Sequence, residues 1–157
     1  MTGAAPWSTL GFQLTIDCAQ PQRLVPFWVA ALGYVVEPPP AGAVTWRDYW
    51  LSIGVPESEL GDGDCADSII DPSGRGPRIW FQQVPEPKVG KNRLHLDLKV
   101  GGDRAEVPLA RRRERIEAEV TRLCAAGAAV SRRDDVDGVD HYYVVMIDPE
   151  GNEFCVG

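Results

Sequence analysis

Residues 31–36 read ALGYVV, and the same helix-to-strand joint returns as AAGAAV at residues 125–130. In each copy an apolar stripe at helical spacing leads to a glycine, Gly33 or Gly127, at the position where helices commonly end. A strand precedes each helix, and further strands follow each joint. The chain therefore repeats one supersecondary unit, and this repeat is the strongest organisational signal in the sequence.

The first unit opens with a strand over residues 11–18, where apolar residues alternate with polar ones. Pro21 then suits the first turn of a helix that carries an apolar stripe as far as Leu32. Pro26 removes one hydrogen bond inside this helix, which predicts a kink or a late start.

Further strands complete the first unit. A short strand is expected at residues 34–37, and residues 78–84 form the last one. Aromatic and β-branched residues dominate residues 44–55, which predicts one strand or a hairpin. Residues 56–76 are rich in Gly, Asp, Ser and Pro, so we expect a long surface loop that covers a site or is partly mobile.

The second unit repeats this order from mid-chain onward. Residues 94–98 alternate as a strand, and a helix with apolar residues on one face covers residues 109–123. The sequence DPEG at residues 148–151 has the composition of a type I turn. The remaining strands are expected at residues 129–133, 141–147 and 153–156.

These elements predict an α+β fold in which two βαβββ repeats form a concave mixed sheet with the helices on its outer face. The length of 157 residues fits a single domain, 1–157, with its halves at residues 11–84 and 92–156. Helices cover only one face of such a sheet. The other face is therefore left for a ligand or for the sheet of the other half.

The charge and the apolar content exclude two classes of partner. A net charge of −7 argues against nucleic acid, which requires a clustered basic face. The basic run at residues 111–113 is followed by glutamates, and we interpret it as the solvated face of a helix. No apolar run approaches the roughly 20 residues that span a bilayer, so no membrane partner is expected.

The expected compartment is the cytoplasm. Residues 1–10 contain neither the basic region nor the apolar region of a signal peptide. The four cysteines lack CxxC spacing, so in a reducing compartment we expect free thiols at Cys18, Cys65, Cys124 and Cys155.

Strand alternation places a set of polar side chains opposite the faces that the helices cover. An ordinary solvent-exposed face would also be polar. However, exposed faces seldom carry His, Cys and Trp at matching positions of different strands, and such a mixture is typical of a pocket. The set comprises Gln13, Thr15, Asp17, Trp80, Gln82, His95, Asp97, Lys99, Glu153 and Cys155.

Three motifs carry a resemblance to a known family. They are FWVAALG at residues 27–33, KNRLHLDL at residues 91–98 and DPEGNEFC at residues 148–155. Together they resemble the glyoxalase-like branch of the vicinal oxygen chelate superfamily, over about residues 11–156. That superfamily includes glyoxalase I, extradiol dioxygenases, fosfomycin-resistance transferases, epimerases and metal-free bleomycin-binding proteins, so the motifs are more specific for the fold than for the chemistry.

The resemblance implies one divalent metal, such as Zn, Ni, Mn or Fe, on the concave sheet. The matching positions for its ligands are Gln13, Gln82 and His95. The last ligand in metal-binding members is normally a glutamate four residues after the glycine of the turn, and here that position holds Cys155. Glu153 lies two residues earlier on the same strand face and is the candidate general base. Because Cys155 stands where metal-binding members have a glutamate, the sequence favours a site without metal.

Each candidate also has a structural interpretation. A buried cysteine often packs as a small hydrophobic residue, and tryptophans more often form core or dimer contacts than stack on ligands. As substrate-binding candidates we name Trp80, Trp50 and Asp97, with Asp97 placed to orient His95 or a substrate.

Three functions are consistent with these residues. The one we favour is a protein that binds a small organic molecule in the concave pocket, with catalysis undecided. The alternative is a metal-dependent lyase, isomerase or oxygenase in which the metal chelates two adjacent substrate oxygens and Glu153 is the base. The third is a structural dimer with a filled concave face. A homodimer is expected, because many relatives build the pocket across two chains.

Overall fold

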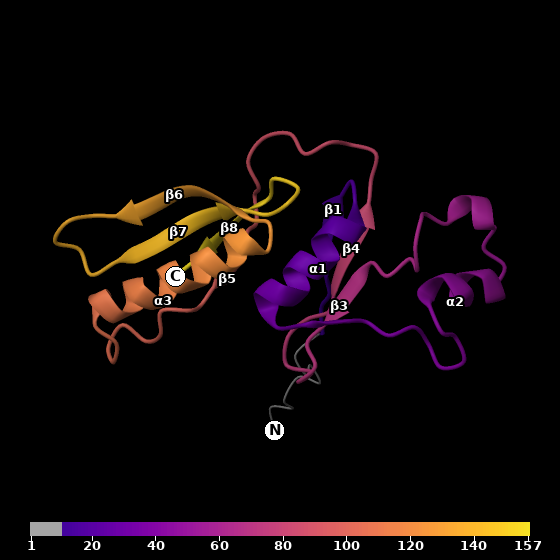
Figure 1. Cartoon of the computed structure of the whole chain (residues 1–157), viewed down its shortest axis with the longest axis horizontal. Helices are drawn as coiled ribbons and strands as arrows, with labels where there is room; N and C mark the ends of the chain where they lie inside the picture. The colour runs from indigo at the N-terminus through magenta and orange to yellow at the C-terminus, as the bar shows by residue number, and fades with distance from the viewer. Residues whose placement is uncertain (1–10) are drawn as a thin grey trace, which may run out of the picture.

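The structure, a computed structural model, describes residues 11–157 and consists of two halves that lie side by side (Figure 1). The first ten residues, on which the expectation of no signal peptide rests, lie outside the described range.

The first half is built on a four-stranded mixed sheet with the strand order β1-β4-β3-β2. Its first and last strands run parallel, and the other two pairs are antiparallel. Its elements are β1 (Leu14–Cys18), α1 (Pro21–Leu32), β2 (Val35–Val36), β3 (Ser68–Ile70) and β4 (Ile79–Gln83).

The second half repeats this topology in the strand order β5-β8-β7-β6. Again the first and last strands are parallel to each other. Its elements are β5 (Asp97–Leu98), α3 (Leu109–Ala125), β6 (Ala129–Asp135), β7 (Tyr142–Ile147) and β8 (Glu153–Val156). The predicted α+β fold of two βαβββ repeats is confirmed, with the strands divided between two sheets.

The prediction of a strand or hairpin at residues 44–55 is wrong. This stretch forms α2 (Trp46–Ser52), followed by the short 3-10 helix η1 (Glu57–Glu59). The reason is a capping box: the Thr45 hydroxyl accepts a hydrogen bond from the backbone N–H of Asp48, and the Asp48 carboxylate accepts one from the backbone N–H of Thr45. These two bonds fix the first turn and override the strand preference of the aromatic residues.

Two smaller expectations also need correction. The stretch 56–76 is not all loop, because it contains η1 and β3. The first helix does not start late: α1 begins at Pro21 and continues through Pro26 to a left-handed Gly33 with φ of 68°. Its buried residues, including Phe27 and Trp28, pack on the sheet and hold the helix in place.

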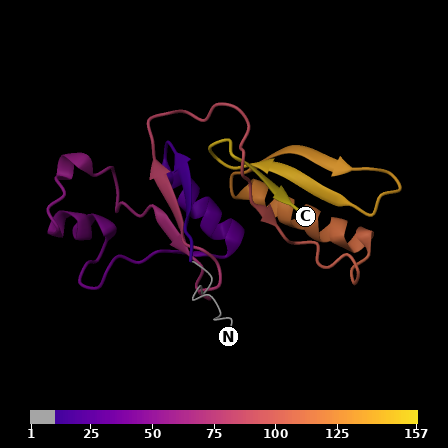
Figure 2. The ribbon, with the colours of Figure 1, turned by 180° about the vertical axis from the view of Figure 1, so that it is seen from behind.

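The core lies between each sheet and its helix, with the helix on one face only (Figures 1 and 2). In β7 and β8 the residues that point toward α3 are almost completely buried, at 0 to 1% exposure: Val144, Met146, Phe154 and Val156. Burial of each such side chain stabilises the fold by roughly 1.5–3 kcal/mol. The neighbouring residues of the same strands point to the opposite face, which is therefore free for a site.

The turn at residues 148–151 fastens the two halves together. The Glu150 carboxylate accepts hydrogen bonds from the backbone N–H groups of Ala19 and Gln20, at 2.7 and 2.6 Å, at the start of α1. Gln20 provides no side-chain cap of its own, so the second half caps the helix of the first. The buried Asp148 accepts a hydrogen bond from Trp28 Nε1 at 3.2 Å.

An aromatic cluster forms a second contact between the two halves. The rings of Phe27, Trp28 and Phe154 meet edge to face, with centroid distances of 5.2 to 5.8 Å. Because Phe154 comes from β8 and the other two from α1, the two halves share one core.

Loss of the Glu150 cap is expected to destabilise the whole chain. Glu150→Ala removes two hydrogen bonds from a carboxylate to a helix start, which should lower the free energy of unfolding by about 1–3 kcal/mol. Urea unfolding measures the change. Glu106→Ala is the matched control, because Glu106 is exposed and should change stability by less than about 0.5 kcal/mol. If both substitutions lowered the free energy of unfolding equally, the role assigned to Glu150 would be contradicted.

Candidate functional site

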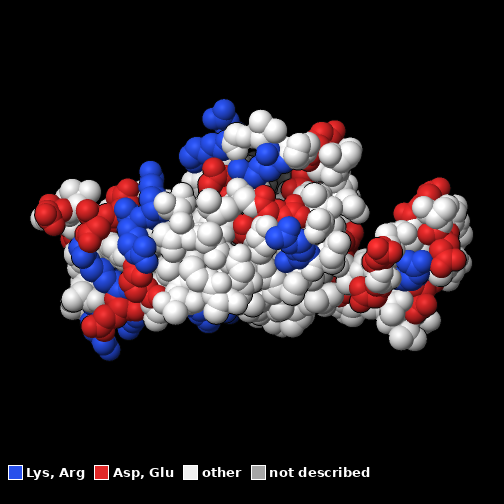
Figure 3. Space-filling view, turned by 45° about the horizontal axis from the view of Figure 1, so that its top comes forward, with Lys and Arg blue, Asp and Glu red and all other residues white. Residues whose placement is uncertain are grey.

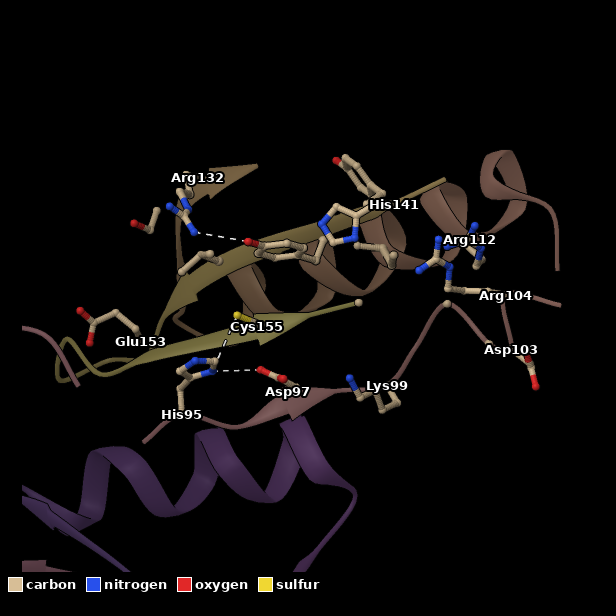
Figure 4. A pocket seen from close by; sticks show the side chains of 18 of the residues that line it. His95, Asp97, Lys99, Asp103, Arg104, Arg112, Arg132, His141, Glu153 and Cys155 are labelled. Carbon is tan, nitrogen blue, oxygen red and sulfur yellow. Dashed lines mark hydrogen bonds and ion pairs between the residues drawn. The ribbon is translucent and has the colours of Figure 1, made fainter. Parts of the chain in front are cut away.

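A pocket of about 890 Å³ lies over the face of the second sheet that is turned away from α3, and it extends to Arg112 and Ile116 of α3 (Figure 4). On β7 and β8 strand alternation produces this lining, because Tyr143, Val145, Glu153 and Cys155 each neighbour a residue that is buried under the helix. The side chains on the strands and beside them are Arg132 from β6, Tyr143 and Val145 from β7, Glu153 and Cys155 from β8, and His95, Asp97 and Lys99 from the β5 segment.

Three of these side chains meet at the floor of the pocket. His95 Nδ1 lies 2.9 Å from Asp97 Oδ1 and 3.9 Å from Cys155 Sγ. The parallel pairing of β5 with β8 places Asp97 directly beside Cys155, which brings the cluster together. Figure 4 shows both contacts as dashed lines. A polar cluster of this kind can bind a ligand or an ion.

The histidine is oriented by its acidic neighbour. When Nδ1 carries the proton it donates to Asp97, and Nε2 then presents its lone pair. Burial and the nearby Asp97 carboxylate raise the pKa of the Cys155 thiol, which keeps it protonated at neutral pH while no ion is bound. The side chains of His95 and Asp97 are 39% and 48% exposed, so solutes can reach both.

Glu153 is held at the edge of the pocket. Its carboxylate accepts a hydrogen bond from the backbone N–H of Asn92 at 3.1 Å and pairs with Lys88 Nζ at 3.1 Å. The hydrogen bond from Asn92, with help from Lys88, lowers the pKa of Glu153 to about 2. The carboxylate is therefore ionised at neutral pH and is a weak proton acceptor.

The pocket is more basic than the chain as a whole. Five basic residues line it against three acidic ones, whereas the chain has a net charge of −7. Arg104 and Arg112 share Asp140 as their ion-pair partner, and Arg132 lies 4.0 Å from Asp134. Within residues 11–157 no carboxylate lies at ion-pair distance from the other two, Lys91 and Lys99.

The other predicted site residues lie outside this pocket. Gln13 stands just before β1, and its amide oxygen accepts a hydrogen bond from Arg78 at 2.6 Å. Trp80 and Gln82 lie on β4 of the first sheet, where Trp80 Nε1 donates to Asp67 at 2.8 Å. Trp50 lies on α2 and contacts Trp46 and Tyr49. The structure thus brings together His95, Asp97, Cys155 and Glu153.

Among the residues that line the pocket, Tyr143 and Arg132 were not predicted from the sequence. The signal for Tyr143 was present, because it alternates with Tyr142 and Val144, which are both buried. Its hydroxyl contacts Asp134 at 3.1 Å and Arg132 at 3.4 Å, which connects β6 and β7 over the pocket. Arg132 could not be found in this way, since it follows a register shift in β6.

A second hollow, of about 1180 Å³, runs along the boundary of the two halves. It is lined by β1, by the connection that leads to β5 and by the turn at residues 148–151. His95 and Glu153 line both hollows, so the cluster stands where the two meet.

Comparison with protein families identifies the fold. The family described as "Glyoxalase-like domain" matches residues 13–157, which is nearly all of the described chain. The chain belongs to the glyoxalase-like domain family. The resemblance expected from the three sequence motifs is confirmed.

Solved structures agree on the fold of this glyoxalase-like protein. A glyoxalase/bleomycin resistance protein/dioxygenase family enzyme from Burkholderia phytofirmans PsJN is similar with a TM-score of 0.54 and 16% identity, over 92% of this chain and 94% of that one. The fosfomycin resistance protein FosX from Mesorhizobium loti has a TM-score of 0.51 and 9% identity, over 99% and 91%.

A third similar structure is FosX from Listeria monocytogenes in complex with Mn(II) and 1S,2S-dihydroxypropylphosphonic acid. It has a TM-score of 0.53 and 10% identity, over 96% of this chain and 89% of that one. No curated protein matches the sequence significantly. Among residues 11–157 there is no helix with the length and apolar character needed to cross a membrane.

The bonds to Glu153 should make stability depend on pH. Its pKa is lowered from about 4.5 to about 2 by folding, so the carboxylate stabilises the fold above about pH 4.5 and loses this effect as the pH falls toward about 2. Glu153→Gln should therefore be less stable than wild type at about pH 7, and the difference should vanish near about pH 2.

Urea unfolding across this pH range measures the difference. Asp137→Asn is the matched control, because Asp137 is exposed on the hairpin between β6 and β7. A stability difference for Glu153→Gln that did not change with pH would contradict the assigned contacts.

Proposed function

We propose that this glyoxalase-like protein binds a small organic molecule in the pocket over the second sheet, with His95 as its principal polar contact. The observation that carries the proposal is the cluster of His95, Asp97 and Cys155 on the floor of a pocket of about 890 Å³. Pockets for small molecules have this size and combine apolar walls with a few converging polar groups.

The remaining lining supports the same function. Tyr143 and Val145 supply apolar surface beside the cluster, and Tyr143 also offers a hydroxyl. The low pKa of Glu153 favours a fixed negative charge at the pocket edge over proton transfer. Binding is therefore better supported than catalysis with Glu153 as the base.

A second candidate function is metal-dependent chemistry in the same pocket. The potential ligand atoms of His95, Asp97 and Cys155 lie within 4.8 Å of one another, which fits one ion with bonds of about 2.0–2.3 Å. A set of one nitrogen, one oxygen and one sulfur donor suits zinc best among the expected metals. When bound, such an ion would polarise substrate oxygens as a Lewis acid.

The fold is compatible with this candidate. A FosX structure with the same fold contains Mn(II) together with a small organic acid. In this chain, His95, Asp97 and Cys155 would hold the ion, and Tyr143 and Lys99 would orient the ligand. Gln13 and Gln82, the other two metal ligands predicted from the family, would need to reach this cluster from the first sheet.

Fragment screening by NMR tests the binding proposal. Small organic acids, diols and aromatic fragments should shift the backbone amides of residues 95–99, 143–145 and 153–157. His95→Ala should weaken binding about tenfold, because a hydrogen bond from the oriented imidazole contributes about 1.4 kcal/mol. Trp80→Phe should leave affinity unchanged. Fragments that shifted the amides around Trp80 and Gln82 instead would contradict the proposed pocket.

Elemental analysis tests the metal candidate. After incubation with Zn, Ni, Mn or Fe(II), we expect about one zinc per chain in wild type and at least about tenfold weaker binding in His95→Ala and Cys155→Ser. Gln13→Ala and Gln82→Ala should bind zinc as wild type does. Loss of the metal in the glutamine variants would assign the site to the family ligands instead, and no metal in wild type would exclude this candidate.

A further inference from the structure

Arg112 is a buried arginine at an apolar position of α3. The buried residues of this helix lie on one stripe at helical spacing, and they are Arg112, Ile116, Val120 and Leu123. The Arg112 side chain is only 6% exposed, whereas arginine is almost never fully buried unless it is paired. The interpretation of residues 111–113 as a solvated face is therefore wrong for Arg112. Packing alone would favour an apolar residue here, so the arginine needs a different explanation.

The guanidinium of Arg112 is held on two sides and open on the third. Nε donates a hydrogen bond to the carbonyl of Val107 at 3.0 Å, and Nη2 pairs with the Asp140 carboxylate. Nη1 has no hydrogen-bond partner within residues 11–157. It is not sealed inside the protein either, because Arg113 Nε is the only fully enclosed side-chain nitrogen or oxygen without a partner in the non-exposed residues of this range. Since Arg112 lines the pocket over the second sheet, Nη1 is a fixed donor that faces this pocket.

Two further basic side chains complete this end of the pocket, which we call the basic end and define as Lys99, Arg104 and Arg112 (Figure 4). Arg104 Nε lies 3.7 Å from Asp140, so two guanidiniums share one carboxylate. Lys99 has no carboxylate at ion-pair distance in the described part of the chain. Asp103 turns away, and its carboxylate accepts a hydrogen bond from the backbone of its own loop at 2.8 Å. Three basic groups against one shared carboxylate leave an excess of two positive charges, which attracts an anion.

The basic end lies opposite His95 in the same pocket. Figure 4 shows His95 and Glu153 on one side, Arg104 and Arg112 on the other, and Lys99 between them. All five line one hollow of about 890 Å³, so one small molecule can contact both ends.

A purely structural role does not account for the basic end. An ion pair that only ties α3 to the hairpin before β7 needs one arginine and one carboxylate. It would leave neither Arg112 Nη1 without a partner nor a second guanidinium on Asp140. The excess of positive charge also stands out in a chain with a net charge of −7. An anion bound in the pocket would satisfy the open donor and balance this charge.

We propose that the basic end binds the anionic group of a small organic ligand, while the polar part of the same ligand contacts His95. The ligand class is therefore an organic acid with a carboxylate or a phosphate-type group. Arginine and lysine form charge-assisted hydrogen bonds to both groups, and these bonds are roughly twice as strong as neutral ones. Because Arg112 is already oriented by its own contacts, it loses little conformational freedom on binding. The inference rests on the proposed function and names its ligand class.

The Arg112 side chain gives a direct reporter of binding at the basic end. Its Nε–H is buried and hydrogen-bonded, so it should give a resolved ¹⁵N–¹H signal. Titration of the wild-type chain with acetate and with inorganic phosphate should shift this signal, whereas acetamide should not. The Nε signal of Arg122, which is paired with Glu119 on the same helix outside the pocket, is the control and should stay in place. No shift of the Arg112 signal with either anion would overturn the proposal.

Matched probes test the ligand class on the full chain. Benzoate and phenylphosphonate should bind at least about tenfold tighter than benzamide, because charge-assisted hydrogen bonds replace neutral ones. The double variant Lys99→Gln/Arg104→Gln should lower this preference to about threefold or less. The double variant Arg75→Gln/Arg111→Gln removes the same charge from exposed positions outside the pocket and should retain the preference. The anion that binds tighter assigns the group as a carboxylate or as a phosphate-type group.

The outcomes separate this inference from the proposed function. The basic end is overturned, and the binding pocket stands, if wild type binds the anions and benzamide equally, if the pocket variant retains the preference, or if the control variant loses it. His95→Ala should weaken all three probes alike and keep the preference. Failure of all three probes to bind would overturn the proposed function and the ligand class together. Thermal unfolding verifies that every variant is folded.

Discussion

The contact between the turn at residues 148–151 and the start of α1 is the constraint on which the rest of the structure depends. Glu150 caps the helix of the first half, Asp148 binds the indole of Trp28, and Phe154 enters the core immediately afterwards. Because residue 154 points into the core, residues 153 and 155 must point the other way. The contact that joins the halves therefore also places Glu153 and Cys155 at the pocket.

The two faces of the second sheet differ sharply in burial and polarity. The face toward α3 is close to fully buried, whereas the opposite face collects His95, Asp97 and Cys155 within hydrogen-bonding or near-contact distance. A protonated thiol, an oriented imidazole and a carboxylate form a versatile polar floor that can contact an organic ligand directly or hold an ion. The proposed binding function follows from this floor and from the volume above it.

Residues 38–66, which contain α2 and η1, stand away from both sheets (Figure 1). Their capping box and aromatic cluster give them local order, yet they lie beyond the core and are acidic where the pocket is basic (Figure 3).

The sequence by itself determined the repeat, the helix ends at Gly33 and Gly127 and the polar face that carries His95, because these depend on local periodicity and turn chemistry. The helix at residues 46–52 was missed, since a single capping box outweighed the strand preference of its aromatic residues. Only the tertiary structure decided which polar residues meet. Gln13 and Gln82 share a pattern with His95, but Gln82 lies on the first sheet and Gln13 just before its first strand. The pairing of β5 with β8 alone brings Asp97 beside Cys155.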